Sequence, residues 1–153
     1  VRSSCPSVHP QAYGGSMVAH PQPRIAHIAL PHDWERAEAN GSYDVSTRGV
    51  SLAEADFVHA ATASQLPGVL DRFYADVPEV VLLVLDVGRL EHEGATVVWE
   101  HVADVAEPFP HVYGVIPVVA VVDRVRLAHL PGDPWTLPDL ASHGIVLRPP
   151  AQT

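Results

Sequence analysis

Short apolar runs separated by polar stretches predict several strands along this chain. Residues 24–30 (RIAHIAL) form one such run, with His27 at its centre, and residues 56–61 (DFVHAA) form another. Residues 79–87 (EVVLLVLDV) are almost entirely apolar, which is typical of a central strand covered on both faces. Residues 95–101 (ATVVWEH) predict a fourth strand.

Two helices are predicted from their end signals and from the spacing of their apolar side chains. Asp33 can accept hydrogen bonds from the first amides of a helix over residues 34–40, and Gly41 can end that helix. Thr62 can cap a second helix over residues 63–75, whose apolar side chains recur at three- and four-residue intervals.

The remaining segments predict two connections and a long last strand. Residues 42–54 are polar and predict a loop, and residues 108–114 (PFPHVYG) predict a rigid turn. Residues 115–127 alternate into a final strand that is broken near Pro117. The predicted order is β-α-β-α-β-β-β. Because strands outnumber helices and cluster late, an α+β fold is favoured over a doubly wound sheet.

The length of 153 residues suits one domain that can bury a core of its own. We expect this domain to span residues 24–130. Residues 1–23 are rich in Ser, Pro, Gly and His and lack periodicity, so they predict a flexible leader. Residues 131–153 carry further prolines and predict a tail that packs on the domain or leaves it.

Charge and composition narrow the classes of partner. The formal net charge is −9, and the nine basic residues are all arginines scattered along the chain. This argues against a nucleic-acid partner, which needs clustered cations, and favours a small neutral or cationic ligand. No apolar run approaches the roughly 18 residues of a membrane span. The single cysteine, Cys5, excludes an internal disulfide framework and fits a soluble cytoplasmic protein, whose oligomeric state the sequence leaves open.

Polar residues inside or beside the apolar runs are the candidates for a functional site. A buried polar group without a partner costs on the order of 1–3 kcal/mol, so each such residue should be paired or should face a cavity. We predict that these side chains converge on one polar pocket. They are His27, His59, Glu100, His111 and Tyr113.

Each candidate also has a purely structural interpretation. His27 could be a core histidine that is bonded to backbone, and His59 could either pack or direct a ring nitrogen at a ligand. Glu100 alternates with Trp99 along its strand, so it is either an exposed glutamate or a carboxylate paired with a histidine or arginine. Thr62 is more simply a helix cap than a ligand contact.

The sequence contains no motif that indicates a metal site, a catalytic nucleophile or a nucleotide-binding loop. The histidines show no HxH, HxxxH or HExxH spacing, and nothing in the spacing favours a metal site made of His27, His59 and Glu100. We therefore predict no metal and no required cofactor. A GxSxG elbow, a GxGxxG fingerprint and a phosphate-binding loop are all absent from the sequence.

Several motifs taken in order resemble a known family. The chain reads RIAHIAL, DWERAEANGSYDVST, DFVHAATASQLPGVLDRFY, VVLLVLDVGRL, VVWEHV and FPHVYGVIPVVAV. This series, from about residue 24 to 127, resembles the uncharacterised bacterial domain-of-unknown-function family 952. One departure is that the family's usual Gly-Phe-Ile-His-Cys-Ser reads DFVHAA here, so Ala61 replaces the serine, and Thr62 could substitute for it.

The resemblance implies a fold similar to that of ADP-ribosyltransferases, a bent, split, antiparallel-rich β-structure with a cleft for NAD. It implies that His27 contacts the ribose on the nicotinamide side, with His59 and Thr62 in a second motif. Glu100 would orient a ribose hydroxyl and stabilise an oxocarbenium-like transition state, and His111 and Tyr113 would line the cleft.

Three functions follow as hypotheses, since a fold does not imply a reaction. The first is a transferase or glycohydrolase with NAD or a related nucleotide as substrate, using Glu100, His59 and His27 as its catalytic residues. The second is a small-molecule binding or regulatory domain without NAD chemistry. The third is an isomerase or cyclase that transfers protons through the His–Glu set.

Overall fold

The computed structural model describes residues 23–150 and is α+β, as the sequence predicts. Within these residues no helix has the length and apolar character needed to span a membrane.

The strands are β1 (Arg24–Ala29), β2 (Ser42–Tyr43), β3 (Val45–Thr47), β4 (Val50–Ser51), β5 (Val58–His59), β6 (Glu79–Asp86), β7 (Thr96–Glu100), β8 (Phe109–Tyr113), β9 (Ile116–Pro117) and β10 (Val121–Ala128). The helices are α2 (Pro31–Asn40), α3 (Leu52–Ala55), α4 (Leu66–Phe73) and α5 (Val87–His92), with 3-10 turns η1 (Val118–Ala120) and η2 (Leu140–His143). The predicted leader and Cys5 lie outside the described residues, apart from Pro23.

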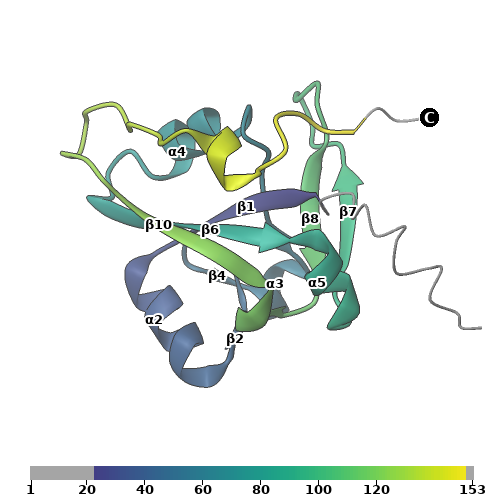
Figure 1. Cartoon of the computed structure of the whole chain (residues 1–153). Coiled ribbons are helices and arrows are strands. Elements are labelled where there is room, and N and C mark those ends of the chain that lie inside the picture. The colour runs from purple at the N-terminus through teal and green to yellow at the C-terminus, as the bar shows by residue number, and fades with distance from the viewer. Residues whose placement is uncertain (1–22, 151–153) are drawn as a thin grey trace, which may run out of the picture.

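The larger sheet has the antiparallel order β1-β6-β10, with α2 on one face and α4 on the other (Figure 1). Side chains on a strand alternate between the two faces. The odd-numbered residues 81–85 of β6 therefore join the core that contains α2, and the even-numbered residues 80–84 join the core that contains α4. The predicted central strand, covered on both faces, is confirmed.

A second antiparallel sheet has the order β5-β8-β7 and stands beside β1 (Figure 1). The backbones of Ala26 and Ala61 exchange two hydrogen bonds of 2.8 and 2.9 Å, which join the two sheets. Val58 and Val112 point into the shared core and are fully buried. The opposite face of this sheet is therefore free to carry polar side chains.

The first helix begins earlier than predicted. α2 starts at Pro31, whose missing amide is tolerated in the first turn, and Leu30 precedes it without a side-chain cap. The carboxylate of Asp33 lies inside this turn and pairs with Arg36 at 3.2 Å, so its predicted capping role is wrong. Gly41 ends the helix with a φ of +88°, as predicted.

The second predicted helix is shorter than expected because a separate turn precedes it. The amide of Thr62 donates to Oε1 of Gln65 at 3.0 Å, and the carbonyl of Thr62 accepts from the amide of Leu66 at 3.2 Å. α4 begins only at Leu66, with no side-chain cap. The predicted cap by the Thr62 hydroxyl is therefore wrong, whereas Pro67 lies in the first turn as its chemistry requires.

Two predicted connections are instead parts of sheets. Residues 42–54 contain β2, β3, β4 and the start of α3 rather than a loop, because strands of two or three residues are too short to show a period. Residues 108–114 contain β8, the middle strand of its sheet, rather than a rigid turn. Pro110 has no amide to donate, but its carbonyl still joins the sheet by accepting from the amide of Ala60 at 3.0 Å. α5 was not predicted.

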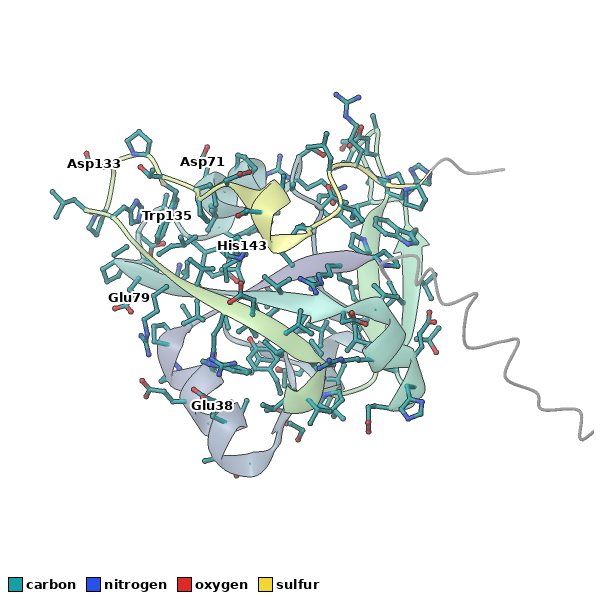
Figure 2. All side chains as sticks on the ribbon, in the orientation of Figure 1. Glu38, Asp71, Glu79, Asp133, Trp135 and His143 are labelled. Atoms are coloured by element: carbon teal, nitrogen blue, oxygen red, sulfur yellow. The ribbon has the colours of Figure 1, made fainter. Side chains whose placement is uncertain are left out.

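The C-terminal segment packs on the domain as far as Leu147. The amide of Val146 donates to the carbonyl of Arg24 at 2.9 Å, and the carbonyl of Val146 accepts from the amide of Ala63 at 2.9 Å. Ile145 is buried in the core that contains α4. Figure 2 shows Trp135 and His143 along this segment, on the same side of the larger sheet as α4.

Candidate functional site

Polar and aromatic side chains gather on the face of the second sheet that points away from the core. This site face consists of Phe57, His59, Glu100, His111 and Tyr113. His59 on β5 pairs in register with His111 on β8, and the hydrogen bonds of Glu100 reach from β7 to the same strand. The alternation that buries Val58 and Val112 thus places all these side chains on one surface.

His27 lies beneath this face, on β1, and is almost completely buried. One ring nitrogen, Nδ1, lies 2.5 Å from the carbonyl oxygen of His59, which can only accept, so Nδ1 carries the proton. The other, Nε2, is 2.8 Å from the hydroxyl of Tyr43 and accepts from it. Burial lowers the pKa of His27 to about 4. His27 is therefore neutral near pH 7, with both ring nitrogens occupied.

His59 has one ring nitrogen held and the other free. The hydroxyl of Ser46 donates to the carbonyl of Phe57, so its oxygen accepts from Nδ1 of His59 at 3.0 Å. Nε2 of His59 consequently carries a lone pair and has no hydrogen-bond partner among the described residues. Burial, and secondarily the neighbouring His111, lower the pKa of His59. This is the arrangement of a base held in one tautomer.

Glu100, Tyr113 and His111 form a hydrogen-bonded set on the same face. The hydroxyl of Tyr113 donates to Oε1 of Glu100 at 2.5 Å, and Nδ1 of His111 donates to the same oxygen at 3.2 Å. The bond from Tyr113, and then that from His111, lowers the pKa of Glu100. The other carboxylate oxygen of Glu100 has no hydrogen-bond partner in the described part of the chain.

Aromatic packing fixes the ring of His111. Its ring stacks on Phe57 with the centroids 4.0 Å apart and the planes at 18°, and it meets His59 edge-on at 5.5 Å. Nε2 of His111 is buried and has no protein partner. A buried nitrogen in this state requires a ligand or water, since leaving it unpaired costs about 1–3 kcal/mol.

A cavity of about 320 Å³ opens beside this face. His27, His59 and His111 all line it, so the structure brings three of the sequence-predicted residues to one space. Glu100 and Tyr113 are not among its lining residues. Glu100 is connected to the cavity through its bond to His111, and Tyr113 bonds Glu100. The volume lies at the lower end of the range for small-molecule sites, about 300–1,000 Å³.

Thr62 lies apart from the other candidates. It is fully buried, its hydroxyl is 3.2 Å from that of Ser64, and it does not line the cavity. As for metals, no cluster of three or more ligating side chains occurs between residues 23 and 150.

Sequence reasoning missed the residues that orient the histidines. Tyr43 and Ser46 come from residues 42–54, which read as a loop, and each bonds a histidine. The available signal was the position of Ser46 between two β-branched residues, Val45 and Thr47, but a three-residue strand gives it little weight. Phe57, which stacks on His111, was predicted only as part of a strand.

Residues 28–124 match the family described as "Protein of unknown function (DUF952)", and the chain belongs to this family. The family resemblance predicted from the motifs is thereby confirmed. His59, Glu100, His111 and Tyr113 lie within the matched range, and His27 lies one position before it.

Among solved structures, the chain is similar to the crystal structure of protein CC0527 from Caulobacter crescentus. The two share 23% sequence identity with a TM-score of 0.62, over 78% of this chain and 96% of that one. The solution NMR structure of CC0527 gives 26% identity and a TM-score of 0.58, over 78% and 95% of the respective chains. These likenesses concern the fold. A search of curated proteins gave no match.

Proposed function

We propose that this protein is an enzyme in which His59 transfers a proton to or from a small organic ligand bound in the cavity. The observation that carries the proposal is the state of the His59 ring. Ser46 holds its protonated Nδ1, so the lone pair on Nε2 is available, and the residue lines the cavity. A lowered pKa keeps this ring neutral, as a general base must be near pH 7.

His111 and Glu100 complete the acid–base set. The carboxylate of Glu100 accepts from Nδ1 of His111, so it would stabilise positive charge that develops on that ring. Nε2 of His111 is buried without a protein partner and would bind a polar atom of the ligand. His27 is a positioning residue in this scheme, because both of its nitrogens are already bonded to protein atoms.

Hydrolysis of the bond between nicotinamide and ribose in NAD is the first specific reaction for this site. The free oxygen of Glu100 supports it, because a carboxylate that accepts from a ribose hydroxyl also stabilises an oxocarbenium-like transition state. Since Glu100 does not line the cavity, the ribose would extend beyond the cavity along the site face. Water would attack the anomeric carbon, nicotinamide would leave with the bonding pair, and His59 would take the proton from water. We also propose, as part of this function, that the fold resembles that of ADP-ribosyltransferases.

The test is release of nicotinamide from NAD by the purified protein. We expect turnover that falls at least 100-fold in His59→Ala, as for loss of a general base, and in Glu100→Gln, as for loss of charge stabilisation in the transition state. His92→Ala removes an exposed histidine that does not line the cavity and should leave turnover unchanged. Absence of both nicotinamide release and an NAD-dependent thermal shift would rule out the NAD reaction.

Proton transfer at carbon, as in an isomerase or cyclase, is a second candidate. The observation that favours it is that His59 and His111 line the cavity whereas Glu100 does not. A panel of small carbon acids incubated in D2O should then show deuterium incorporation by NMR. The exchange should disappear in His59→Ala and persist in Glu100→Gln at a reduced rate, which separates this reaction from cleavage of NAD.

A further inference from the structure

The charged side chains that line the cavity are both cationic. They are Arg48 and Arg72, and no Asp or Glu occurs among the lining residues. The chain as a whole carries a formal charge of −9. The charge of the cavity lining is therefore opposite in sign to the net charge of the chain. A positive local field of this kind favours an anionic ligand.

Arg48 is already neutralised by the protein. Its guanidinium donates to both carboxylate oxygens of Asp76, at 2.7 and 3.0 Å, and to the carbonyl of Phe73 at 3.2 Å. These bonds tie the turn after β3 to the end of α4. Arg48 therefore has a structural role in the cavity wall, and its charge is compensated by Asp76 rather than available to a ligand.

Arg72 is different because it forms no ion pair or side-chain hydrogen bond with another described residue. It lies in the last turn of α4, is exposed, and its guanidinium carbon is 6.0 Å from the centre of the Phe73 ring. A guanidinium has a planar set of donors that matches a carboxylate or a phosphate. An unpaired one at the edge of a cavity is suited to bind such a group.

The rest of the wall is largely apolar. It includes Val69, Phe73, Val102, Val105 and Phe109. Phe73 is 52% exposed and Val102 is 43% exposed, which is a high exposure for large apolar side chains. A ligand with an apolar ring would cover them, because removing apolar surface from water is favourable.

We propose that the cavity binds a small organic anion, an apolar ring that carries a carboxylate or a phosphate ester, with the anionic group on Arg72. The ring lies between Phe73 and Val102, and the reacting end of the ligand lies at His59. The inference deepens the proposed function and rests on it only for the position of the reacting end. The recognition of the anion rests on the guanidinium of Arg72, which is unpaired among the described residues.

Binding of simple probes tests this without any turnover. Benzoate and phenyl phosphate share an apolar ring and carry the two anionic groups, and benzamide is the neutral counterpart of benzoate. Isothermal titration of the full chain should give binding of at least one anion that is ten or more times tighter than that of benzamide. Arg72→Ala should weaken anion binding about tenfold or more, as expected for a hydrogen-bonded charge, and leave benzamide unaffected.

Matched variants separate this proposal from the function proposed above. Arg89→Ala removes an exposed arginine outside the cavity and should not change anion binding. His59→Ala should abolish the proposed chemistry but keep anion binding. Equal affinity for benzoate and benzamide, equal loss in Arg72→Ala and Arg89→Ala, or no binding of either anion at millimolar concentration would each overturn the proposal. If the anions bind and no substrate turns over, only the catalytic function fails.

Discussion

The hydroxyl oxygen of Ser46 lies 3.0 Å from Nδ1 of His59 and decides which ring nitrogen of His59 carries the proton. The backbone carbonyl of Phe57 fixes this tautomer, because the Ser46 hydroxyl donates its proton to that carbonyl. Only the lone pairs of the Ser46 oxygen are then left to bond His59. An oriented imidazole of this kind needs no neighbouring carboxylate. The relationship therefore supplies a base that has a free ring nitrogen and lines the cavity.

Replacement of Ser46 should allow the ring of His59 to adopt either neutral tautomer. We expect Ser46→Ala to let the proton distribute between Nδ1 and Nε2, visible in the ¹⁵N chemical shifts of the ring. Ser46 is fully buried, and the variant removes its bond to the part-buried carbonyl of Phe57, so the free energy of unfolding should fall by about 1 kcal/mol. Ser42→Ala is the control, since the Ser42 hydroxyl makes no hydrogen bond with a described residue. A His59 ring that keeps its proton on Nδ1 in Ser46→Ala would contradict this role.

His27 should make the protein less stable as the solution becomes mildly acidic. Its pKa is lowered from 6.5 to about 4 by burial, so the unfolded chain takes up a proton below about pH 6.5 and the folded chain only below about pH 4. The free energy of unfolding is then highest above pH 6.5 and falls by an amount on the order of 3 kcal/mol as the pH drops to 4. His59, with its lowered pKa, acts in the same direction.

Urea unfolding at several pH values between 7 and 4.5 measures this effect. The carboxyls with lowered pKa values contribute only below their ordinary value of about 4.5, so this window isolates the histidines. His27→Gln should be less stable at pH 7, because it loses the ring that bonds both His59 and Tyr43, but should lose less stability on acidification than the natural chain. Equal slopes in the two proteins would exclude His27 as the source.

Removal of the Tyr113 hydroxyl should raise the pKa of Glu100. This hydroxyl is the largest cause of the lowered pKa, because its hydrogen bond favours the ionised carboxylate. We expect Tyr113→Phe to shift the Glu100 titration upward, toward 4.5, in ¹³C NMR spectra of the side-chain carboxyl. Tyr74→Phe removes a buried hydroxyl that bonds Ile28 instead and should leave the titration unchanged.

Gly114 should not tolerate a side chain. It follows Tyr113 with a φ of +121°, and a Cβ there would lie 3.4 Å from Ala95. Gly114→Ala should therefore lower the free energy of unfolding by about 1–3 kcal/mol, the usual cost of a strained backbone. Gly68→Ala is the contrasting variant, because Gly68 is helical, exposed and free of neighbours within 4 Å. That change should stabilise the protein by up to about 1 kcal/mol. Thermal unfolding of both variants distinguishes the two cases.

Local features of the fold could be read from the sequence because they depend on neighbouring residues. The apolar run of β6 indicated a strand buried on both faces, and Gly41 marked the end of α2. The segment 42–54 and β8 could not be assigned in this way. β3 and β4 pair with each other but are too short to show a period, whereas β2 and β8 pair with the distant strands β9 and β5. The role of Thr62 was also misassigned. The turn before α4 is closed by the side-chain oxygen and the backbone amide of Gln65, and not by the hydroxyl of Thr62.

For the site, the sequence by itself determined which side chains needed an explanation. His27, His59 and His111 stand in apolar runs, and a polar group in such a place must be paired or must face a cavity. Only the tertiary structure decided which of these two outcomes each residue has. The partners of His27 are 16 and 32 residues away, and that of His59 is 13 residues away on a strand the sequence did not reveal. Hydrogen-bond partners of this kind follow from how the sheets meet, so the structure leaves His27 with no free nitrogen and His59 with one.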